Sequence, residues 1–216
     1  MTFPRLSERL ETALSLVPDG AVVFDVGSDR GDFLLALEAK GNKAYGCENK
    51  MGPYDGLVKN LKANQSKVKA FLQDGISFLP EEVDCLTILG MGGRTIRGIL
   101  ERGKKNLANV KDLIVSPQSC VEETIDFLSE NGYQNIAGKY IRETRYYPVL
   151  LFHKMGDYPI LLDEGERCYG AWPLAQKDPL LLDMLRQRLS LLNTLPPTKK
   201  NLCEKMDLER RIASWN

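Results

Sequence analysis

The sequence is poor in histidine and has neither paired cysteines nor a long apolar segment. Its single histidine, His153, lies inside an apolar run, which is an unpromising position for a metal ligand or a catalytic base. The five cysteines are scattered singly, which argues against a zinc site or disulfides and for a reducing compartment. No apolar run reaches membrane-spanning length, and the first residues do not read as a secretion signal. We therefore expect a cytoplasmic protein that binds neither a metal nor a membrane.

An excess of charge of one sign is also missing, because 29 basic and 29 acidic side chains cancel. A nucleic-acid partner would therefore have to meet a local basic patch instead of a globally basic surface. The 216 residues, 43% of them hydrophobic, suffice for one full core plus an appendage.

The strongest pattern in the sequence runs from Val22 to Gly31. An apolar run ends in Asp25-Val-Gly27, turns at Ser28-Asp29 and continues into a helical pattern, which predicts a strand, a tight turn and a helix. Such a turn places a nucleotide-like ligand against backbone N–H groups. Asp29 stands where a dinucleotide fingerprint has its second glycine, and an acid there repels a pyrophosphate but attracts an ammonium or sulfonium. The pattern predicts an adenosyl ligand held by Asp25, Gly27, Ser28, Asp29 and Gly31.

Three later strand ends extend this predicted site. Glu48 ends a strand expected at 43–48, where it could accept hydrogen bonds from ribose hydroxyls or simply face solvent. Asp74 follows a strand expected at 68–72 and could reach an adenine amino group or cap a helical turn at 76–79. A glycine-rich turn follows a buried strand at 83–89, where a planar group could lie against bare backbone. The expected cofactor contacts here are Glu48, Asn49, Asp74, Gly75, Gly90, Met91 and Gly92.

The remaining elements predict an α/β fold with a mixed sheet, because five β/α alternations precede a final strand pair. Helices are expected at 6–17, 32–40 and 53–65, around Ile96–Leu100, and after a capping box formed by Ser119 and Glu122. The last strands are expected at 112–115, 136–142 and 146–153. Residues 159–165 and 169–173 read as loops, and helices at 180–195 and 201–215 flank a Pro-Pro turn. We divide the chain into a domain at residues 1–155 and a helical extension at residues 156–216.

Two groups of basic residues are candidates for phosphate contacts. Arg94 and Arg97 follow the glycine-rich turn, although a charged helix face is often only solvated. From Arg186 to Arg211, seven basic residues oppose three acids, which suits either a phosphate backbone or an exposed helix pair.

Taken together, these motifs resemble the TrmK family of bacterial tRNA (adenine-N1)-methyltransferases, which act at tRNA position 22. The resemblance is carried by Asp25-Val-Gly-Ser-Asp29, Gly90-Met-Gly-Gly93, Ser116-Pro-Gln118 and the passage Tyr169–Leu180, and it runs nearly end to end. It implies a Rossmann-like class I methyltransferase with a seven-stranded mixed sheet, S-adenosyl-L-methionine as cofactor and tRNA as partner. It also implies a C-terminal coiled-coil-like hairpin that helps to bind tRNA. The expected RNA contacts are Arg30, Arg94, Arg97, Lys199 and Lys200.

The chain departs from the family pattern at two places. Arg30-Gly31-Asp32 stand where the family commonly has histidine and an apolar pair, and Ser116-Pro117-Gln118 stand where it tends to have Gln-Pro-Asn. These changes leave open a methyltransferase fold that binds RNA or cofactor without catalysis. A nicotinamide-dependent oxidoreductase is a third alternative, disfavoured by Asp29 and by the lack of a hydride-transfer base.

Methylation at adenine N1 gives Asp29 a candidate catalytic role. N1 lies on the Watson–Crick edge, so the base must be unpaired or flipped outward to reach the cofactor. Methylation leaves a cationic ring unless the N6 proton departs, and the Asp29 carboxylate could stabilise that charge or accept the proton. Asp29 could equally bind the amino group of the cofactor or fix the turn.

Overall fold

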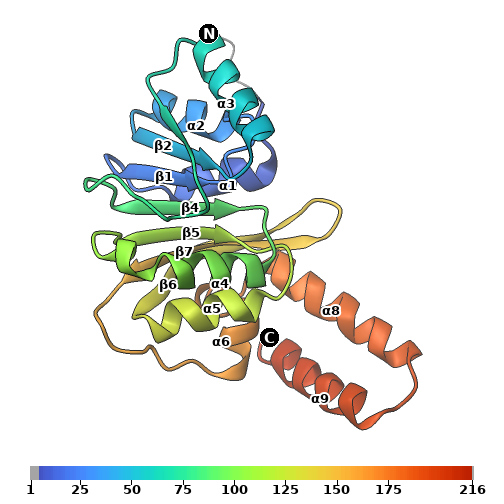
Figure 1. Cartoon of the computed structure of the whole chain (residues 1–216). Helices are drawn as coiled ribbons and strands as arrows, with labels where there is room; N and C mark the ends of the chain where they lie inside the picture. Colours follow the sequence, from blue (N-terminus) through green and yellow to red (C-terminus); the bar gives the residue numbers. More distant parts are fainter. Residues whose placement is uncertain (1–4, 216) are drawn as a thin grey trace.

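The computed structural model describes residues 5–215, in which one mixed sheet forms the centre of the fold (Figure 1). Its seven strands follow the order β3-β2-β1-β4-β5-β7-β6. The strands are β1 (Val22–Val26), β2 (Lys43–Glu48), β3 (Lys69–Leu72), β4 (Cys85–Leu89), β5 (Asp112–Ser116), β6 (Tyr133–Arg142) and β7 (Tyr146–Lys154). Strand β7 runs antiparallel to β5 and β6, whereas all other pairs are parallel. The predicted seven-stranded mixed sheet is confirmed.

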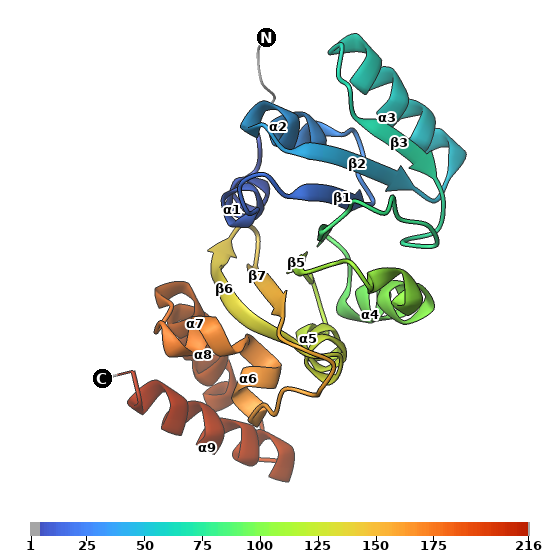
Figure 2. The same ribbon diagram turned by 90° about the vertical axis from the view of Figure 1, so that its left-hand side faces the viewer.

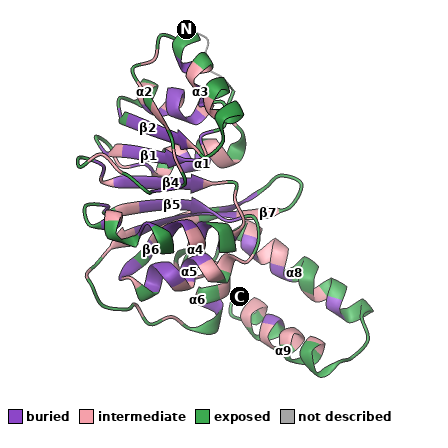
Figure 3. Ribbon diagram, viewed as in Figure 1, coloured by how far each residue is buried: buried purple, intermediate pink, exposed green. Residues whose placement is uncertain are grey.

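Helices cover both faces of the sheet, and Figure 2 shows α1 on the side opposite α4 and α5. One hydrophobic cluster joins the sheet to α1, α2 and α3, and a second joins it to α4 and α5. The central strands β1, β4 and β5 are buried almost throughout (Figure 3), which explains their near-continuous apolar sequences. The helices are α1 (Glu8–Leu16), α2 (Asp32–Lys40), α3 (Met51–Ala63), α4 (Gly93–Arg102), the 3-10 helix η1 (Lys104–Leu107) and α5 (Val121–Glu130).

The predicted capping box at Ser119 and Glu122 is wrong. Helix α5 begins after Cys120, which has a φ of 48° and makes no side-chain cap. The Ser119 carbonyl instead accepts a hydrogen bond of 2.7 Å from Gly93 N, and a Cβ on Gly93 would clash with the Cys120 carbonyl. Close packing between the starts of α4 and α5 therefore overrides the local signal.

Two other local predictions are also wrong. Residues 76–79 form no helical turn; the Asn106 side chain donates to the carbonyls of Ile76 and Ser77 and holds this segment against η1. Residues 159–165 and 169–173 are not all loop, because α6 (Glu164–Tyr169) and α7 (Ala171–Ala175) overlap them. Helix α6 starts with a capping box between Asp163 and Glu166, a signal that the sequence carries.

The C-terminal hairpin consists of α8 (Pro179–Thr194) and α9 (Lys199–Ala213), which lie side by side and project away from the sheet (Figure 1). Its base shares a hydrophobic cluster with β6, built from Tyr140, Leu181, Leu185, Leu192 and Leu208. Buried Asp178 accepts hydrogen bonds from Leu180 N and Leu181 N at the start of α8, and from Tyr140 N. The domain boundary at residue 155 stays a prediction, and this contact crosses it. No helix within residues 5–215 is long and apolar enough to cross a bilayer.

We expect Asp178→Ala to lower the free energy of unfolding by roughly 2–4 kcal/mol, because it removes a helix cap and leaves the buried Tyr140 N–H without a partner. Urea denaturation measures this change. Thr198→Ala is the matched control, since Thr198 caps α9 from an exposed position; it should cost only about 1 kcal/mol. Equal losses in the two variants would contradict a docking role for Asp178.

Candidate functional site

A pocket of about 440 Å³ opens at the carboxyl edge of the parallel strands, where the loops after β1, β2, β4 and β5 meet α1. Ligands of open α/β sheets bind at this edge. Its lining includes seven of the residues that the sequence predicts for the cofactor: Asp25, Gly27, Ser28, Asp29, Glu48, Gly90 and Met91. The volume lies within the usual range of small-molecule sites, about 300–1,000 Å³.

The turn between β1 and α2 is fastened to the end of β2. Gly27 N and Ser28 N both donate to the Cys47 carbonyl, at 3.0 and 3.1 Å. Asp29 N donates to Glu48 Oε1 at 2.5 Å. Gly27 and Asp29 have φ angles of 74° and 49°, a left-handed conformation that glycine adopts without strain and aspartate tolerates better than most residues. The turn therefore brings the acids of two strands to one wall of the pocket.

Asp25 is the buried acid of the site. Thr87 Oγ1 donates to its carboxylate at 2.6 Å. Burial raises the pKa of Asp25 to about 6, partly offset by hydrogen bonds from Thr87 and Ser28, while the charge of Glu48 adds to the rise. The carboxylate is thus ionised at neutral pH, but its negative charge is poorly solvated. A cationic ligand in the pocket would offset part of this desolvation free energy.

Five residues predicted for the cofactor lie outside the pocket lining: Gly31, Asn49, Asp74, Gly75 and Gly92. Asp74 pairs with Arg102 at 3.0 Å. A Cβ on Gly31 would lie 2.6 Å from Leu57 Cδ1, and one on Gly75 would lie 2.7 Å from Ile99 Cγ2. These two glycines therefore serve helix packing, and a cofactor role for all five stays a prediction.

Other pocket residues escaped the sequence analysis. Ser7, Arg9 and Leu10 reach the pocket from the N-terminal segment, and Gln118 reaches it from the loop after β5. The apolar spacing of α1 revealed its buried face, but nothing local showed that its other residues would face the edge of the sheet. Gln118 was noted only within the passage Ser116-Pro-Gln118, which both carries the resemblance and departs from the family pattern. Its backbone N–H donates to the Met91 carbonyl at 2.8 Å and holds the two loops together.

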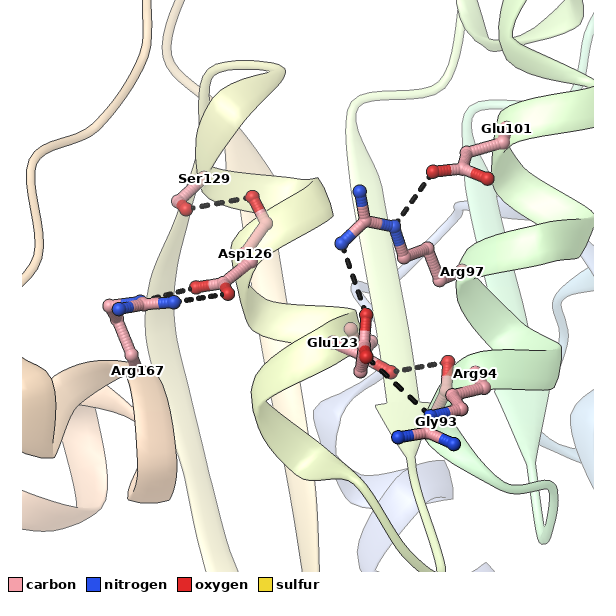
Figure 4. A network of polar contacts seen from close by, with 9 residues as sticks. Gly93, Arg94, Arg97, Glu101, Glu123, Asp126, Ser129 and Arg167 are labelled. Atoms are coloured by element: carbon pink, nitrogen blue, oxygen red, sulfur yellow. Dashed lines mark hydrogen bonds and ion pairs between the residues drawn. The ribbon is translucent and has the colours of Figure 1, made fainter.

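Two of the basic residues predicted to bind RNA, Arg94 and Arg97, lie beside acidic side chains of the protein itself (Figure 4). Arg97 donates to Glu101 at 2.7 Å and to Glu123 at 3.1 Å, and Arg94 lies 3.6 Å from Glu123. Pairing with Glu101, and then with Glu123, raises the pKa of Arg97 despite some desolvation. Exposed Arg30 lines the pocket, whereas exposed Lys199 and Lys200 begin α9 at the outer end of the hairpin. RNA contacts by any of these residues stay predictions.

Comparison with known proteins identifies the family. A sequence profile of a methyltransferase domain matches residues 6–150, well over half of the chain. A Streptococcus pneumoniae protein assigned as a tRNA (m1A22) methyltransferase is 30% identical, with 98% of each chain covered and a TM-score of 0.83. The Bacillus subtilis m1A22 tRNA methyltransferase TrmK is 25% identical, with 98% of this chain and 97% of that chain covered and a TM-score of 0.77. The chain belongs to the TrmK group of methyltransferases.

Membership in the TrmK group confirms the resemblance drawn from the sequence motifs. A second structure of the Streptococcus pneumoniae protein, in complex with S-adenosyl-L-methionine, has a TM-score of 0.88 at 28% identity and covers 96% of this chain and 100% of that one. The curated tRNA (adenine(22)-N(1))-methyltransferase of Bacillus subtilis is 32% identical over 135 residues. That match spans 60% of this chain and 56% of the curated relative, so little more than half of the relative is matched.

The raised pKa of Asp25 predicts a pH-dependent stability. The unfolded carboxyl titrates near 3.8 and the folded one near 6, so between these values the folded state keeps a proton that the unfolded state has released. The free energy of unfolding should therefore fall as the pH rises from about 4 to about 6, and Asp25→Asn should lack this fall. The variant should gain roughly 3 kcal/mol relative to the unmodified protein over this interval. Urea denaturation of both proteins at several pH values checks this, and a constant difference would contradict it.

Proposed function

We propose that this protein transfers a methyl group from S-adenosyl-L-methionine to N1 of adenine 22 in tRNA. The observation that carries the proposal is the pocket wall formed by Asp25, Asp29 and Glu48 at the carboxyl edge of the sheet. The TrmK relatives, one of them solved with S-adenosyl-L-methionine, support it. We further propose that the protein acts in the cytoplasm, where tRNA and this cofactor are both present.

The pocket residues fit this cofactor in charge and in shape. When bound, S-adenosyl-L-methionine supplies an electrophilic methyl group on a positively charged sulfur. Glu48 lies at the end of β2, where its carboxylate can accept hydrogen bonds from ribose hydroxyls. Asp25 and Asp29 place negative charge near a ligand cation. Gly90 presents bare backbone to the pocket, with a φ of 75°, so a planar group can approach closely.

The task of the chain is mainly to align the base and to exclude water, because adenine N1 carries its own lone pair. Asp29 lies in the exposed part of the pocket lining, where an incoming flipped base would meet it. We assign to its carboxylate the stabilisation of the cationic methylated ring or the acceptance of the N6 proton. Its alternative role is to bind the ammonium group of the cofactor.

Two of the residues that depart from the family pattern, Gly31 and Asp32, fit their surroundings in the fold. Gly31 packs against Leu57 of α3. Asp32 is the first residue of α2, where the positive end of the helix dipole stabilises its negative charge. Neither change removes Asp29 or Glu48 from the pocket. An enzyme is therefore preferred over a non-catalytic binding protein, and its methyltransferase relatives argue against an oxidoreductase.

Incubation of the protein with labelled S-adenosyl-L-methionine and an unmodified tRNA transcript tests the proposal. We expect label in a transcript with adenine at position 22 and none in a matched transcript with guanine there. In Asp29→Asn, turnover at saturating cofactor and tRNA should fall by about 10²–10⁴ if the carboxylate assists the reaction. Asparagine tolerates the same positive φ, so the turn should persist.

Two results would contradict these assignments. Label that is independent of position 22 would reject the assigned target. A single-turnover rate of Asp29→Asn within a few-fold of the unmodified enzyme would reject the catalytic role. A raised KM for the cofactor with that unchanged rate would assign Asp29 to cofactor binding.

We also propose that Lys199 and Lys200 contact the tRNA backbone, because both are exposed at the start of α9, next to the loop that joins the two helices of the hairpin. Replacing both with glutamate should weaken tRNA binding and reduce its salt dependence, whereas cofactor affinity should not change. Filter binding at several salt concentrations measures this. Replacement of Lys104 and Lys105, exposed on η1 between α4 and β5, is the matched control. Equal losses in both double variants would show only a nonspecific charge effect.

A further inference from the structure

A second groove, of about 320 Å³, adjoins the cofactor pocket at the β1–α2 turn. It lies between Asp29 and Arg30 of that turn and one face of α3, which includes Gly56, Lys59 and Asn60. Asp29 and Arg30 also line the cofactor pocket, so the two hollows meet at these residues. The groove therefore begins where the target adenine would meet Asp29.

The groove is a built feature of the fold, because α3 is fastened to the turn. Asn60 Nδ2 donates to the Arg30 carbonyl at 2.6 Å. On the neighbouring face of α3, Leu57 and Leu61 are buried, and both lie within 4 Å of the position that a Cβ on Gly31 would take. The position of α3 relative to Arg30 is thus held by a hydrogen bond and by apolar packing.

The groove carries two cations that the protein itself does not neutralise. Arg30 and Lys59 are exposed, and neither forms an ion pair within residues 5–215. Among the described residues, Asp29 is the only acid that lines the groove. Residues 50–69 as a whole carry five lysines and one acid. On a chain without net charge, this local excess suits an anionic partner.

Gly56 leaves open space on the groove face of α3. A Cβ placed on it would meet no atom within 4 Å, so packing within the described part of the chain does not require a glycine. Glycine inside a helix is nevertheless about 1 kcal/mol less favourable than alanine. A ligand that comes close to the helix backbone beside Lys59 accounts for the missing side chain.

We propose that this groove binds the RNA backbone next to the target adenine, with Arg30 and Lys59 holding one of the two phosphates that flank it. The inference rests on the proposed function, because it takes tRNA as the substrate. A base that is flipped into the cofactor pocket stays joined to a phosphate on each side, so these phosphates lie near the mouth of the pocket. The shared residues Asp29 and Arg30 place the groove at this mouth.

Methylation kinetics on a transcript with adenine at position 22 test the inference with two matched pairs of variants. Gly56→Gln fills the groove, whereas Gly52→Gln adds the same side chain one turn earlier on α3, where a Cβ also meets nothing. Lys59→Gln removes a charge from the groove, and Lys62→Gln removes one from the same helix outside it. The two groove variants should raise the KM for tRNA by roughly 3- to 10-fold, and the two controls by less than about 2-fold.

Two further measurements show whether the groove variants act on RNA alone. The affinity for S-adenosyl-L-methionine, measured by calorimetry, should stay unchanged in both, because neither Gly56 nor Lys59 lines the cofactor pocket. Urea denaturation of Gly56→Gln should show no loss of stability, because glutamine is a better helix former than glycine. A loss of cofactor affinity or of stability that parallels the rise in KM would show a structural effect and overturn the assignment.

The phosphate contact is tested with synthetic RNA in which one linkage is an uncharged methylphosphonate. At one of the two linkages that flank adenine 22, this replacement should raise the KM of the unmodified protein. The rise should be smaller in Lys59→Gln, because that variant has already lost part of the contact. The same replacement at a linkage remote from adenine 22 is the control. An effect that is equal in the two proteins, or absent at both flanking linkages, would reject the phosphate contact of Lys59.

The outcomes also separate this inference from the proposed function. A protein that leaves adenine 22 unmethylated would overturn the function and the inference with it. A protein that methylates adenine 22 with the same KM for tRNA in the groove variants as in their controls would overturn only the inference.

Discussion

The site depends on the attachment of the β1–α2 turn to the end of β2. The Cys47 carbonyl accepts two backbone hydrogen bonds from this turn, and the Glu48 side chain accepts a third. These bonds require a left-handed backbone at Gly27 and Asp29, and they determine where the Asp29 side chain enters the pocket. Glu48 thereby combines two tasks, because the carboxylate proposed to hold the ribose also fixes the neighbouring turn. Its replacement would disturb both the ligand contact and the geometry of the turn.

The sequence predicts best those parts of the fold whose environment is uniform along the chain. Strands β1, β4 and β5 are buried on both faces, so their apolar runs identified them with bounds close to those observed. Local sequence signals, such as a capping box, were less reliable where contact with another element determines the backbone conformation. Ser119 and Glu122 have the spacing of a capping box, yet contact with Gly93 determines the start of α5. At Asp163 and Glu166 the same spacing does mark the start of a helix, α6, although the sequence analysis read residues 159–165 as a loop.

In the site, too, the sequence predicts residues that lie close together along the chain better than residues brought in by contacts between distant elements. Asp25, Gly27, Asp29 and Glu48 are found by spacing, because two consecutive β/α units bring them together. Arg9 reaches the pocket from a helix that packs beside β5 and β7, and no periodicity in the sequence reports that contact. Arg97 illustrates the converse. The sequence shows a free cation after a glycine-rich turn, whereas the fold brings Glu123 of α5 against it. Packing between elements that are separated in the sequence thus both adds a pocket residue, Arg9, and neutralises a predicted one, Arg97.

The same argument changes the meaning of the basic excess in the hairpin. Seven basic residues oppose three acids between Arg186 and Arg211, but the fold pairs Arg188 with Glu204, and both Arg210 and Arg211 with Asp207. Lys205 also lies within 3.9 Å of Glu209. The more exposed of these pairs contribute little to stability, so a phosphate could replace their acids at low cost. Of these seven basic residues of the hairpin, the three for which the structure of residues 5–215 gives no ion pair are Arg186, Lys199 and Lys200. Two of these three lie at the start of α9, so the positive charge that no acid of the hairpin offsets lies mainly where the loop between the two helices enters α9.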